Sequence, residues 1–178
     1  MAAIDDFKAN LLGGGARTNQ FRVTITGPPG IAIGLDVRRT SFLCKATTLP
    51  AVELQPITLK YRGRSVIIAG DRETTGTWAT TFYMDTDFMI MNALQRWSNG
   101  INDFDLNTGV ASLSDYATDL TAEMIDRDDT VLKTYIFKNA WPLVVGAPPA
   151  LDSAGDNTIG EFECTWQYQN YSISGVNF

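Results

Sequence analysis

Apolar and polar side chains alternate with a period of two along much of this chain. The clearest case is the segment 161–169, in which Phe162, Cys164, Trp166 and Tyr168 are separated by Glu, Thr and Gln. Successive side chains of a β-strand point to opposite faces, so this spacing predicts a strand with one buried face. A chain made of such strands covers its apolar faces by stacking two sheets or by closing one sheet into a barrel.

Shorter stretches with the same period predict further strands, separated by turns rich in Gly, Pro and Asp. The predicted strands cover residues 21–26, 41–46, 57–61, 65–69, 78–84, 116–125 and 131–139. Trp141-Pro142 is expected to end the last of these. The segments 57–61 and 65–69 are expected to pair as a hairpin.

One segment changes to helical spacing. Apolar residues recur there every three or four positions, at Ile90, Leu94, Trp97 and Ile101. This spacing predicts a helix over 87–99 that docks its apolar stripe on the sheet. Asp85, Thr86 and Asp87 are candidates for its N-cap, and Asn99-Gly100 is expected to end it. Loops are expected over 102–114 and 147–157.

The length of 178 residues predicts a single domain over 1–178. Three consecutive glycines at 13–15 predict a flexible joint, so 1–15 is expected to be a mobile N-terminal arm or a short helix. No apolar run approaches the length of a membrane span, and the first residues do not resemble a signal peptide. We therefore expect a cytoplasmic protein without a membrane anchor, with Cys44 and Cys164 as buried, reduced thiols.

Charge and composition exclude several functions. The chain has no histidine, which excludes Ser-His-Asp and Cys-His catalysis and any imidazole metal site. Its net charge is -6, whereas tight binding to nucleic acid needs a basic surface that neutralises phosphates. DNA is therefore not expected to be a tightly bound ligand.

Motifs for chemistry are incomplete. The stretch 103–109 resembles a calcium loop, but its glycine falls one place late and Ser114 stands where a bidentate Glu is needed. Glu161 and Glu163 could serve acid–base chemistry, although a solvated strand face explains them more simply. The sequence predicts no catalytic residue, no metal ligand and no cofactor, and hence a protein that is not an enzyme.

Residues 42–50, Phe-Leu-Cys-Lys-Ala-Thr-Thr-Leu-Pro, resemble the Cys-Lys-Ala-Thr-x-Leu-Pro segment of the tail tube proteins of contractile-tailed bacteriophages of the T-even type. Further short matches follow in the same order along nearly the whole chain: Ala69-Gly70-Asp71-Arg72, the strand with Trp78, the helix with Trp97, Ala140-Trp141-Pro142, Val145-Gly146 and the final strand. The chain departs from the family in a longer turn over 27–34 and in the loop 147–154.

The resemblance implies an all-β fold, an antiparallel sandwich or barrel with one flanking helix. It also implies that six subunits close a ring and that rings stack into a hollow tube, the inner tube of a contractile tail. Its partners would be other copies of itself, the tail sheath, the baseplate and tail terminator proteins, and a tape measure protein in the lumen. DNA would pass only in transit. The protein would belong to the virion tail and would assemble in the cytoplasm of the host bacterium.

The resemblance also suggests roles for individual residues. The extended hairpin over 52–69 resembles the family's long hairpin, which would contact neighbouring subunits and the next ring. Lys60, Tyr61, Arg62 and Arg64 lie in it and would meet acidic partners there. The segment Gly70-Asp71-Arg72 is expected to form a structural turn, in which Asp71 and Arg72 cap or cross-link the chain.

Carboxylates are expected to line the channel or to face the sheath. An acidic or neutral wall lets DNA slide, whereas rows of Lys and Arg would hold its phosphates. Strand carboxylates are the lumen candidates, namely Asp119, Glu123, Glu161 and Glu163. Alternation alone does not distinguish the lumenal from the outer face, and Asp103 and Asp105 after the helix are candidates for contact with a basic sheath element.

Other readings stay open at this point. The nearest alternative is a tube subunit of a tailocin or of a type VI-like contractile injection system. A carbohydrate-binding sandwich would use exposed aromatic side chains such as Trp141 or Tyr171. A hydrolase with a carboxylate pair would need a pocket.

Overall fold

The computed structural model describes residues 2–155 and 157–177. The elements of the chain are α1 (Ala2–Asn10), a 3₁₀ turn (Leu12–Gly14), β1 (Phe21–Thr24), α2 (Val37–Leu43), β2 (Cys44–Thr47), β3 (Leu54–Tyr61), β4 (Arg64–Arg72), β5 (Gly76–Tyr83), α3 (Met89–Ile101), α4 (Leu113–Tyr116), β6 (Thr118–Ile125), β7 (Val131–Val145), β8 (Glu161–Tyr168) and β9 (Asn170–Gly175). In those described ranges, no helix is long and apolar enough to cross a membrane.

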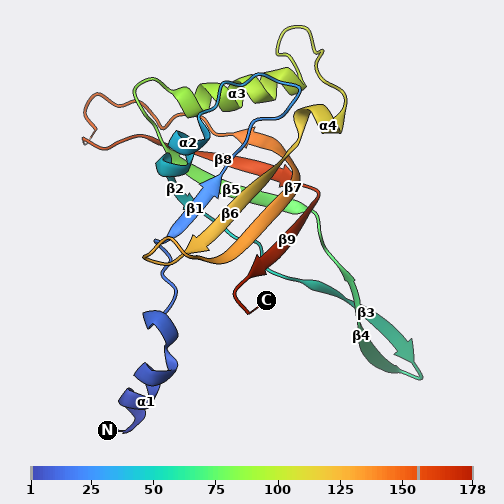
Figure 1. The fold of residues 1–178 in the computed structure, drawn as a ribbon. Coiled ribbons are helices and arrows are strands. Elements are labelled where there is room, and N and C mark those ends of the chain that lie inside the picture. The colour runs from blue at the N-terminus through green and yellow to red at the C-terminus, as the bar shows by residue number, and fades with distance from the viewer. Residues whose placement is uncertain (1, 156, 178) are drawn as a thin grey trace.

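Seven antiparallel strands form one strongly bent sheet in the order β1-β6-β7-β8-β5-β2, with β9 also paired to β7. Strand β7 joins the two halves of this sheet, because its first part pairs with β6 and β9 and its last part pairs with β8. The bend lies near Asn139, whose φ of 51° is left-handed. Figure 1 shows the result as two layers, with β1, β6, β7 and β9 in front of β2, β5 and β8. The expected all-β antiparallel fold is confirmed.

The core between the layers is built from aromatic side chains. Trp78 stacks on Phe137 with ring centres 4.3 Å apart, and Trp166 lies edge-on to Trp97 of α3 at 5.5 Å. Each of these indoles also donates a hydrogen bond: Trp78 to Thr47 Oγ1, Trp166 to Thr80 Oγ1 and Trp97 to the Tyr116 carbonyl, all between 2.7 and 2.9 Å. A buried indole N–H without an acceptor would be costly, so these bonds help to specify the packing.

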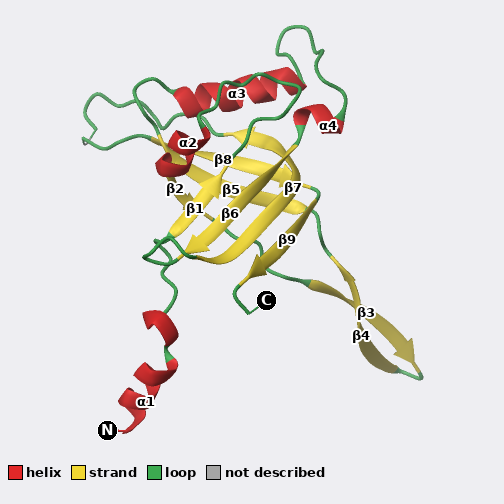
Figure 2. Cartoon of the chain, in the orientation of Figure 1, coloured by secondary structure: helices red, strands yellow, loops and turns green. Residues whose placement is uncertain are grey.

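Helix α3 covers one end of this two-layered sheet, which we call the barrel, and is the expected flanking helix, displaced by two residues (Figure 2). Its apolar stripe, Ile90, Leu94 and Trp97, is buried as predicted. Gly100 does not end it: a Cβ there would lie 2.6 Å from Ile31 Cγ2, so glycine is needed for close packing. At the other end Asp87 Oδ1 accepts the Met89 N–H at 3.2 Å, one residue before the N-cap Phe88.

Three further expectations about local structure are wrong, and one strand was not predicted. Residues 41–43 belong to helix α2, because Asp36 caps it by accepting the Arg39 N–H at 3.1 Å. Helix α4 lies where only a loop or strand is expected, at 113–116. Strand β7 continues past Pro142, which lies opposite Trp166 next to an irregularity in the pairing with β8. The sequence patterns also missed β9, a short strand on the free edge of β7.

Two segments extend away from the barrel at the same end, on opposite sides (Figure 1). One is the β3–β4 hairpin, a separate two-stranded sheet with bounds of 54–72, where the expected extended hairpin spans 52–69. The other is α1, so the N-terminal arm contains a short helix. All three glycines at 13–15 have positive φ, consistent with a sharp change of direction between α1 and the barrel.

Candidate functional site

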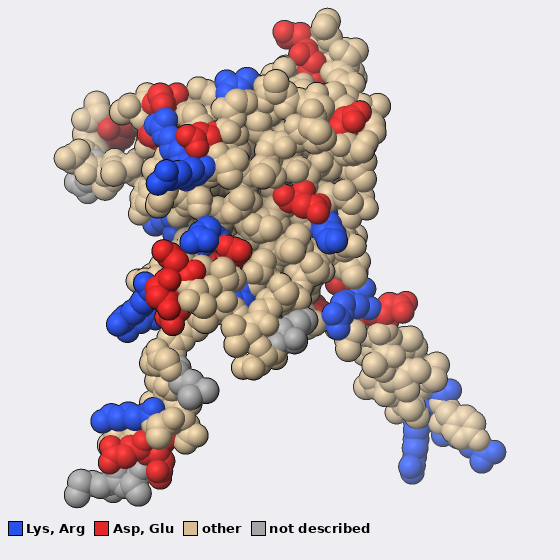
Figure 3. Space-filling view, viewed as in Figure 1, with Lys and Arg blue, Asp and Glu red and all other residues tan. Residues whose placement is uncertain are grey.

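The tip of the β3–β4 hairpin is a tight turn with an exposed cluster of cations. Arg62 and Gly63 have φ values of 47° and 79°, the left-handed pair that a two-residue hairpin turn requires. The Arg62 guanidinium lies 5.3 Å from the centre of the Tyr61 ring. Within the described part of the chain, Lys60, Arg62 and Arg64 form no ion pair with an acidic side chain. Figure 3 shows this positive charge at the end of the projecting arm.

One face of the hairpin is apolar and uncovered. Side chains of directly paired residues lie on the same face, and the pairs here are Ile57 with Ile68 and Leu59 with Val66. Between 45 and 51% of each of these four residues is exposed. An isolated two-stranded hairpin is only marginally stable in water. The hairpin therefore has the character of a surface that another polypeptide covers.

The expected turn at Gly70-Asp71-Arg72 is wrong, because all three residues belong to strand β4. Arg72 pairs with Leu54, and the pairing is irregular between Leu54 and Pro56. A Cβ on Gly70 would lie 2.7 Å from the Gln55 carbonyl oxygen, so glycine permits the two backbones to approach closely at this irregularity. The segment is the base of the hairpin, where it leaves the barrel.

The lumen candidates on β6 face outward from the front layer. The neighbouring residues Leu120 and Ala122 are buried, which places Asp119 and Glu123 on the opposite face. Asp119 Oδ1 accepts the Asn139 N–H at 3.0 Å and so supports the bend of β7. Glu123 lies 3.6 Å from Arg22 of β1. Both carboxylates have local structural contacts in the single subunit.

The lumen candidates on β8 face outward from the other layer. Glu161 accepts hydrogen bonds from Lys45 Nζ at 2.6 and 2.7 Å, and this contact raises the pKa of Lys45. Glu163 is exposed, and no described cation pairs with it. Because the inner faces of the two layers form one core, the β6 pair and the β8 pair lie on opposite outer faces. The structure therefore does not bring the four lumen candidates together.

Asp103 and Asp105 lie in the loop after α3. Asp103 Oδ1 accepts the N–H groups of Asp105 and Leu106 at 3.0 and 2.9 Å, and these bonds lower the pKa of Asp103. Asp103 thus shapes its own loop, whereas Asp105 is exposed. In residues 2–155 and 157–177, no three His, Cys, Asp or Glu side chains gather as metal ligands would. The residues with calcium-like spacing therefore form a loop that is held by hydrogen bonds from its own backbone to Asp103.

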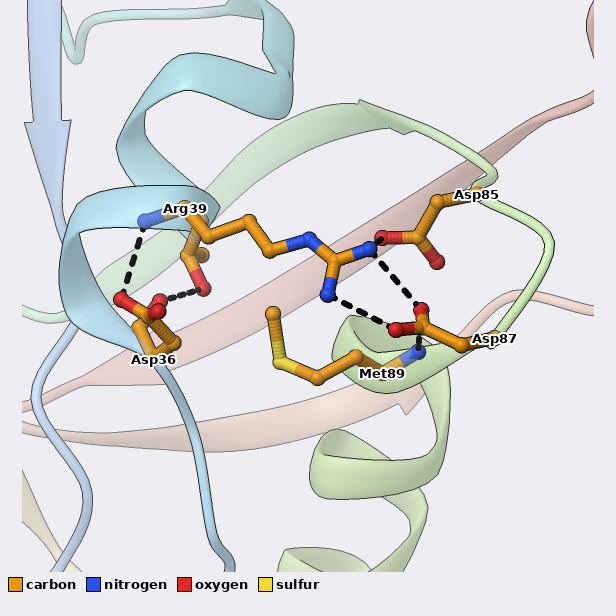
Figure 4. A network of polar contacts seen from close by, with 6 residues as sticks. Asp36, Arg39, Asp85, Asp87 and Met89 are labelled. Atoms are coloured by element: carbon orange, nitrogen blue, oxygen red, sulfur yellow. Dashed lines mark hydrogen bonds and ion pairs between the residues drawn. The ribbon is translucent and has the colours of Figure 1, made fainter.

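An ionic network that the sequence patterns missed links α2 to the start of α3 (Figure 4). Arg39 binds both Asp87 oxygens, at 2.7 and 3.1 Å, and lies 2.9 Å from Asp85 Oδ2. Hydrogen bonding to Asp87 raises the pKa of Arg39, and the same contact lowers the pKa of Asp87. The sequence signal that was available is Asp36, because Asp is a preferred N-cap residue. It marks the start of helix α2, the helix that carries Arg39.

The groups that could support other functions are engaged in packing. Burial raises the pKa of the Cys44 thiol to about 12 and that of Cys164 further, which disfavours the reactive thiolate form of both. The expected burial of both cysteines is confirmed. The two aromatics considered for glycan binding also have partners: Trp141 lies edge-on to Tyr116, and the Tyr171 hydroxyl donates to the Ala51 carbonyl at 3.0 Å.

A shallow apolar cavity of about 750 Å³ lies between the loop before α3 and the loop between β7 and β8. Its apolar lining includes Met84, Phe88, Leu151 and Ile159, and the last two are strongly exposed. The cavity lies at the loop 147–154, one of the two segments in which the sequence differs from the family that it resembles. The sequence patterns did not predict it, because it forms between two segments that are far apart in the chain.

The comparisons with known proteins agree with this description. A family model described as phage tail tube protein matches residues 16–174. A tail tube protein of Serratia phage KSP90 is 28% identical over 170 residues, which cover 94% of this chain and 95% of that protein. The tail tube protein gp19 of Enterobacteria phage T4 is 29% identical over 151 residues, covering 84% and 86% of the two chains.

Solved structures share the fold at low sequence identity. A chain of the sheath–tube complex of PVC, an extracellular contractile injection system in its extended state, superposes with a TM-score of 0.63 at 15% identity, covering 95% of this chain and 97% of that one. A chain of the cap that terminates the tube of the anti-feeding prophage has a TM-score of 0.62 at 16% identity, covering 90% and 91%.

Proposed function

Because the chain belongs to the phage tail tube protein family, we propose that six copies close a ring and that the rings stack into the hollow inner tube of a contractile phage tail. The chain is a structural tube subunit, as are its named phage relatives. The sheath would surround this tube, and contraction would drive it through the host envelope so that DNA passes along the channel. In this role the protein works as a conduit and not as an enzyme.

The uncovered hairpin is the observation that carries the assembly proposal. Its apolar face, formed by Ile57, Leu59, Val66 and Ile68, has no cover in the single subunit. Monomeric proteins rarely leave a contiguous apolar surface of this kind exposed on a thin projection. Contact with a neighbouring copy would bury it, and a head-to-tail interface between identical subunits closes into a ring when its rotation permits.

The charges of the hairpin tip fit the same role. Lys60, Arg62 and Arg64 would meet acidic side chains of a neighbouring subunit or of the next ring, while Tyr61 supports Arg62 through its ring. Acidic partners are abundant, because the chain has 20 Asp and Glu against 14 Lys and Arg. The hairpin would thus combine an apolar contact with a charge-selective one, which specifies a register.

The channel wall is one of the two outer faces of the barrel. One carries Asp119 and Glu123, and the other carries Glu161 and Glu163. We propose that only one pair faces the lumen, since the pairs point in opposite directions. Reversing one charge on each face distinguishes them: Glu123→Lys and Glu163→Lys tubes should both form, and only the lumenal substitution should slow DNA ejection by adding a phosphate contact.

The proposed partners follow from the tail as a whole. The tail sheath would contact the outer wall, and Asp105 with Asp103 is a candidate contact for a basic sheath element. Baseplate and terminator proteins would bind the two ends of the tube, and a tape measure protein would fill the lumen before DNA does. The likeness to a sheath–tube complex and to a tube-terminating cap supports these partners. The protein would reside in the virion tail after assembly in the host cytoplasm.

A second candidate is the tube of another contractile device. The fold likeness to PVC and to the anti-feeding prophage favours it, since those are injection systems. The phage reading is stronger because the family model and both phage relatives match at the level of sequence. The nature of the cargo distinguishes the two, and DNA in the lumen of isolated particles would identify a phage tail.

Negative-stain electron microscopy of the purified chain over a range of concentrations tests the proposed assembly. Rings or hollow tubes are the expected result, either spontaneously or after addition of a baseplate or a tube fragment as a seed. Particles that stay monomeric at every concentration, with and without a seed, would contradict it.

A further inference from the structure

We propose that helix α1 of one copy packs on the apolar face of the β3–β4 hairpin of a neighbouring copy. This inference rests on the proposed assembly and names the surface that covers the hairpin. It concerns the two segments that project from the barrel, each of which leaves an apolar face uncovered in the single subunit. The partner is thus a second copy of this chain.

The exposed apolar side chains of the N-terminal arm lie along one face of its helix. Ile4, Phe7 and Leu11 follow one another at spacings of three and four, which places them on one stripe. The Leu11 N–H donates to the Phe7 carbonyl at 3.1 Å, so Leu11 continues the last helical turn. Ile4 is 64% exposed, Phe7 65% and Leu11 44%. A helix this short is marginal in water and needs packing to persist.

The two apolar faces match in length. From Ile4 to Leu11 the helix rises about 10 Å, at roughly 1.5 Å per residue. From Ile57 to Tyr61 the strand extends about 13 Å, at roughly 3.3 Å per residue. The stripe of three side chains can therefore lie along the row of Ile57, Leu59 and Tyr61 on the hairpin face.

The charges of the two segments are complementary. The helix carries Asp5 and Asp6 beside its apolar stripe, against one cation, Lys8. The hairpin tip carries Lys60, Arg62 and Arg64, none of which is paired with an acidic side chain in the described chain. Opposite charges at the rim of an apolar contact favour this pairing over helix with helix or hairpin with hairpin.

The placement of the two segments excludes contact within one subunit and favours contact between subunits. Helix α1 and the hairpin leave the same end of the barrel on opposite sides, and Figure 3 shows them far apart, at the lower left and lower right of the body. When identical subunits repeat side by side, the helix side of one copy meets the hairpin side of the next. Such a heterologous contact propagates around a ring.

Cross-linking of the full-length chain tests the contact. In Phe7→Cys/Leu59→Cys, an assembled sample treated with a short bismaleimide should give a covalent ladder of oligomers, because each copy contributes one thiol to each of its two neighbours. The native Cys44 and Cys164 are buried and should not react. The matched control is Phe7→Cys/Thr58→Cys, which moves the second thiol to the other face of the hairpin and should cross-link at least tenfold less.

A charge exchange gives a second, independent readout. Asp5→Lys/Asp6→Lys and Arg62→Glu/Arg64→Glu should each raise the concentration needed for tube growth about tenfold, and combining all four should restore most of the loss. Tubes that form without a Phe7–Leu59 ladder and without rescue would overturn this inference and leave the proposed function standing. Failure of the unmodified chain to form rings or tubes would instead overturn the proposed function and this inference with it.

Discussion

Strand β8 of the barrel and strand β3 of the hairpin carry the same alternating pattern, but their apolar faces have opposite environments. In β8, Phe162, Cys164, Trp166 and Tyr168 are at most 4% exposed. In β3, Ile57, Leu59 and Tyr61 are 45 to 65% exposed. Alternation predicts that a strand has an apolar face, but it does not say which chain covers that face. The barrel covers its own strands, and we propose that the hairpin depends on a neighbour.

The largest expected effect tests the barrel half of this comparison. Trp166→Ala removes a fully buried indole that contacts Trp78 and Trp97, and should lower the free energy of unfolding by about 3–5 kcal/mol. Chemical denaturation of the isolated subunit measures it. A loss below about 1 kcal/mol would show that the core is packed more loosely than the contacts indicate.

Substitutions in the hairpin should have the opposite effect: they should leave the stability of the free subunit nearly unchanged and weaken assembly. Ile57→Ser/Leu59→Ser should change the free energy of unfolding of the free subunit by no more than about 1 kcal/mol, because both side chains are already about half exposed. The same variant should raise the concentration needed for tube growth at least tenfold. Ile67→Ser, on the opposite face of the hairpin and 69% exposed, is the matched control and should assemble more nearly like the unmodified chain.

A smaller effect concerns the Arg39 network that joins α2 to α3. Because the pKa of Asp87 is lowered in the folded chain, its contribution to stability is present above the unfolded pKa of about 3.9 and is lost as the pH falls through the folded value. Thermal melts of the unmodified chain and of Arg39→Ala should therefore differ at pH 7 and converge at acid pH, once Asp87 is protonated in the folded chain. A difference that persists unchanged at low pH would contradict the role of this ion pair.

The smallest expected effect is the absence of thiol reaction in the folded barrel. Burial raises the pKa of Cys44 to about 12 and that of Cys164 further, so neither thiol forms thiolate near pH 8. A colorimetric thiol reagent should label neither cysteine in the native subunit and both after denaturation. Rapid labelling of the native protein would indicate that the barrel opens near β2 or β8.

Strong local patterns predicted most of the barrel. Trp78, Trp97 and Trp166 lie on strand or helix faces whose period is readable from the sequence, and all three are buried. The errors occur where a single contact outweighs the pattern. Asp36 turns 37–43 into a helix by capping it, and Gly100 continues α3 because it packs against Ile31.

The candidate surfaces were less predictable, because burial and direction depend on long-range packing. The basic hairpin tip follows from local residues and lies where the sequence suggested. The four carboxylates expected at the lumen wall divide between two outer faces, which depends on how β7 bends and joins the layers. Likewise Gly70 reads as a turn residue, but its role is to permit a close backbone approach within β4.

Hydrogen exchange measured by mass spectrometry, before and after assembly, tests the central claim most directly. In the free subunit, amides of β5 and β8 should exchange slowly, while those of β3, β4 and α1 should exchange within seconds to minutes. After assembly, β3, β4 and α1 should become strongly protected, while the barrel core changes little. A hairpin that is already protected in the free subunit, or that stays unprotected in the assembled tube, would contradict the claim that a neighbouring copy covers it.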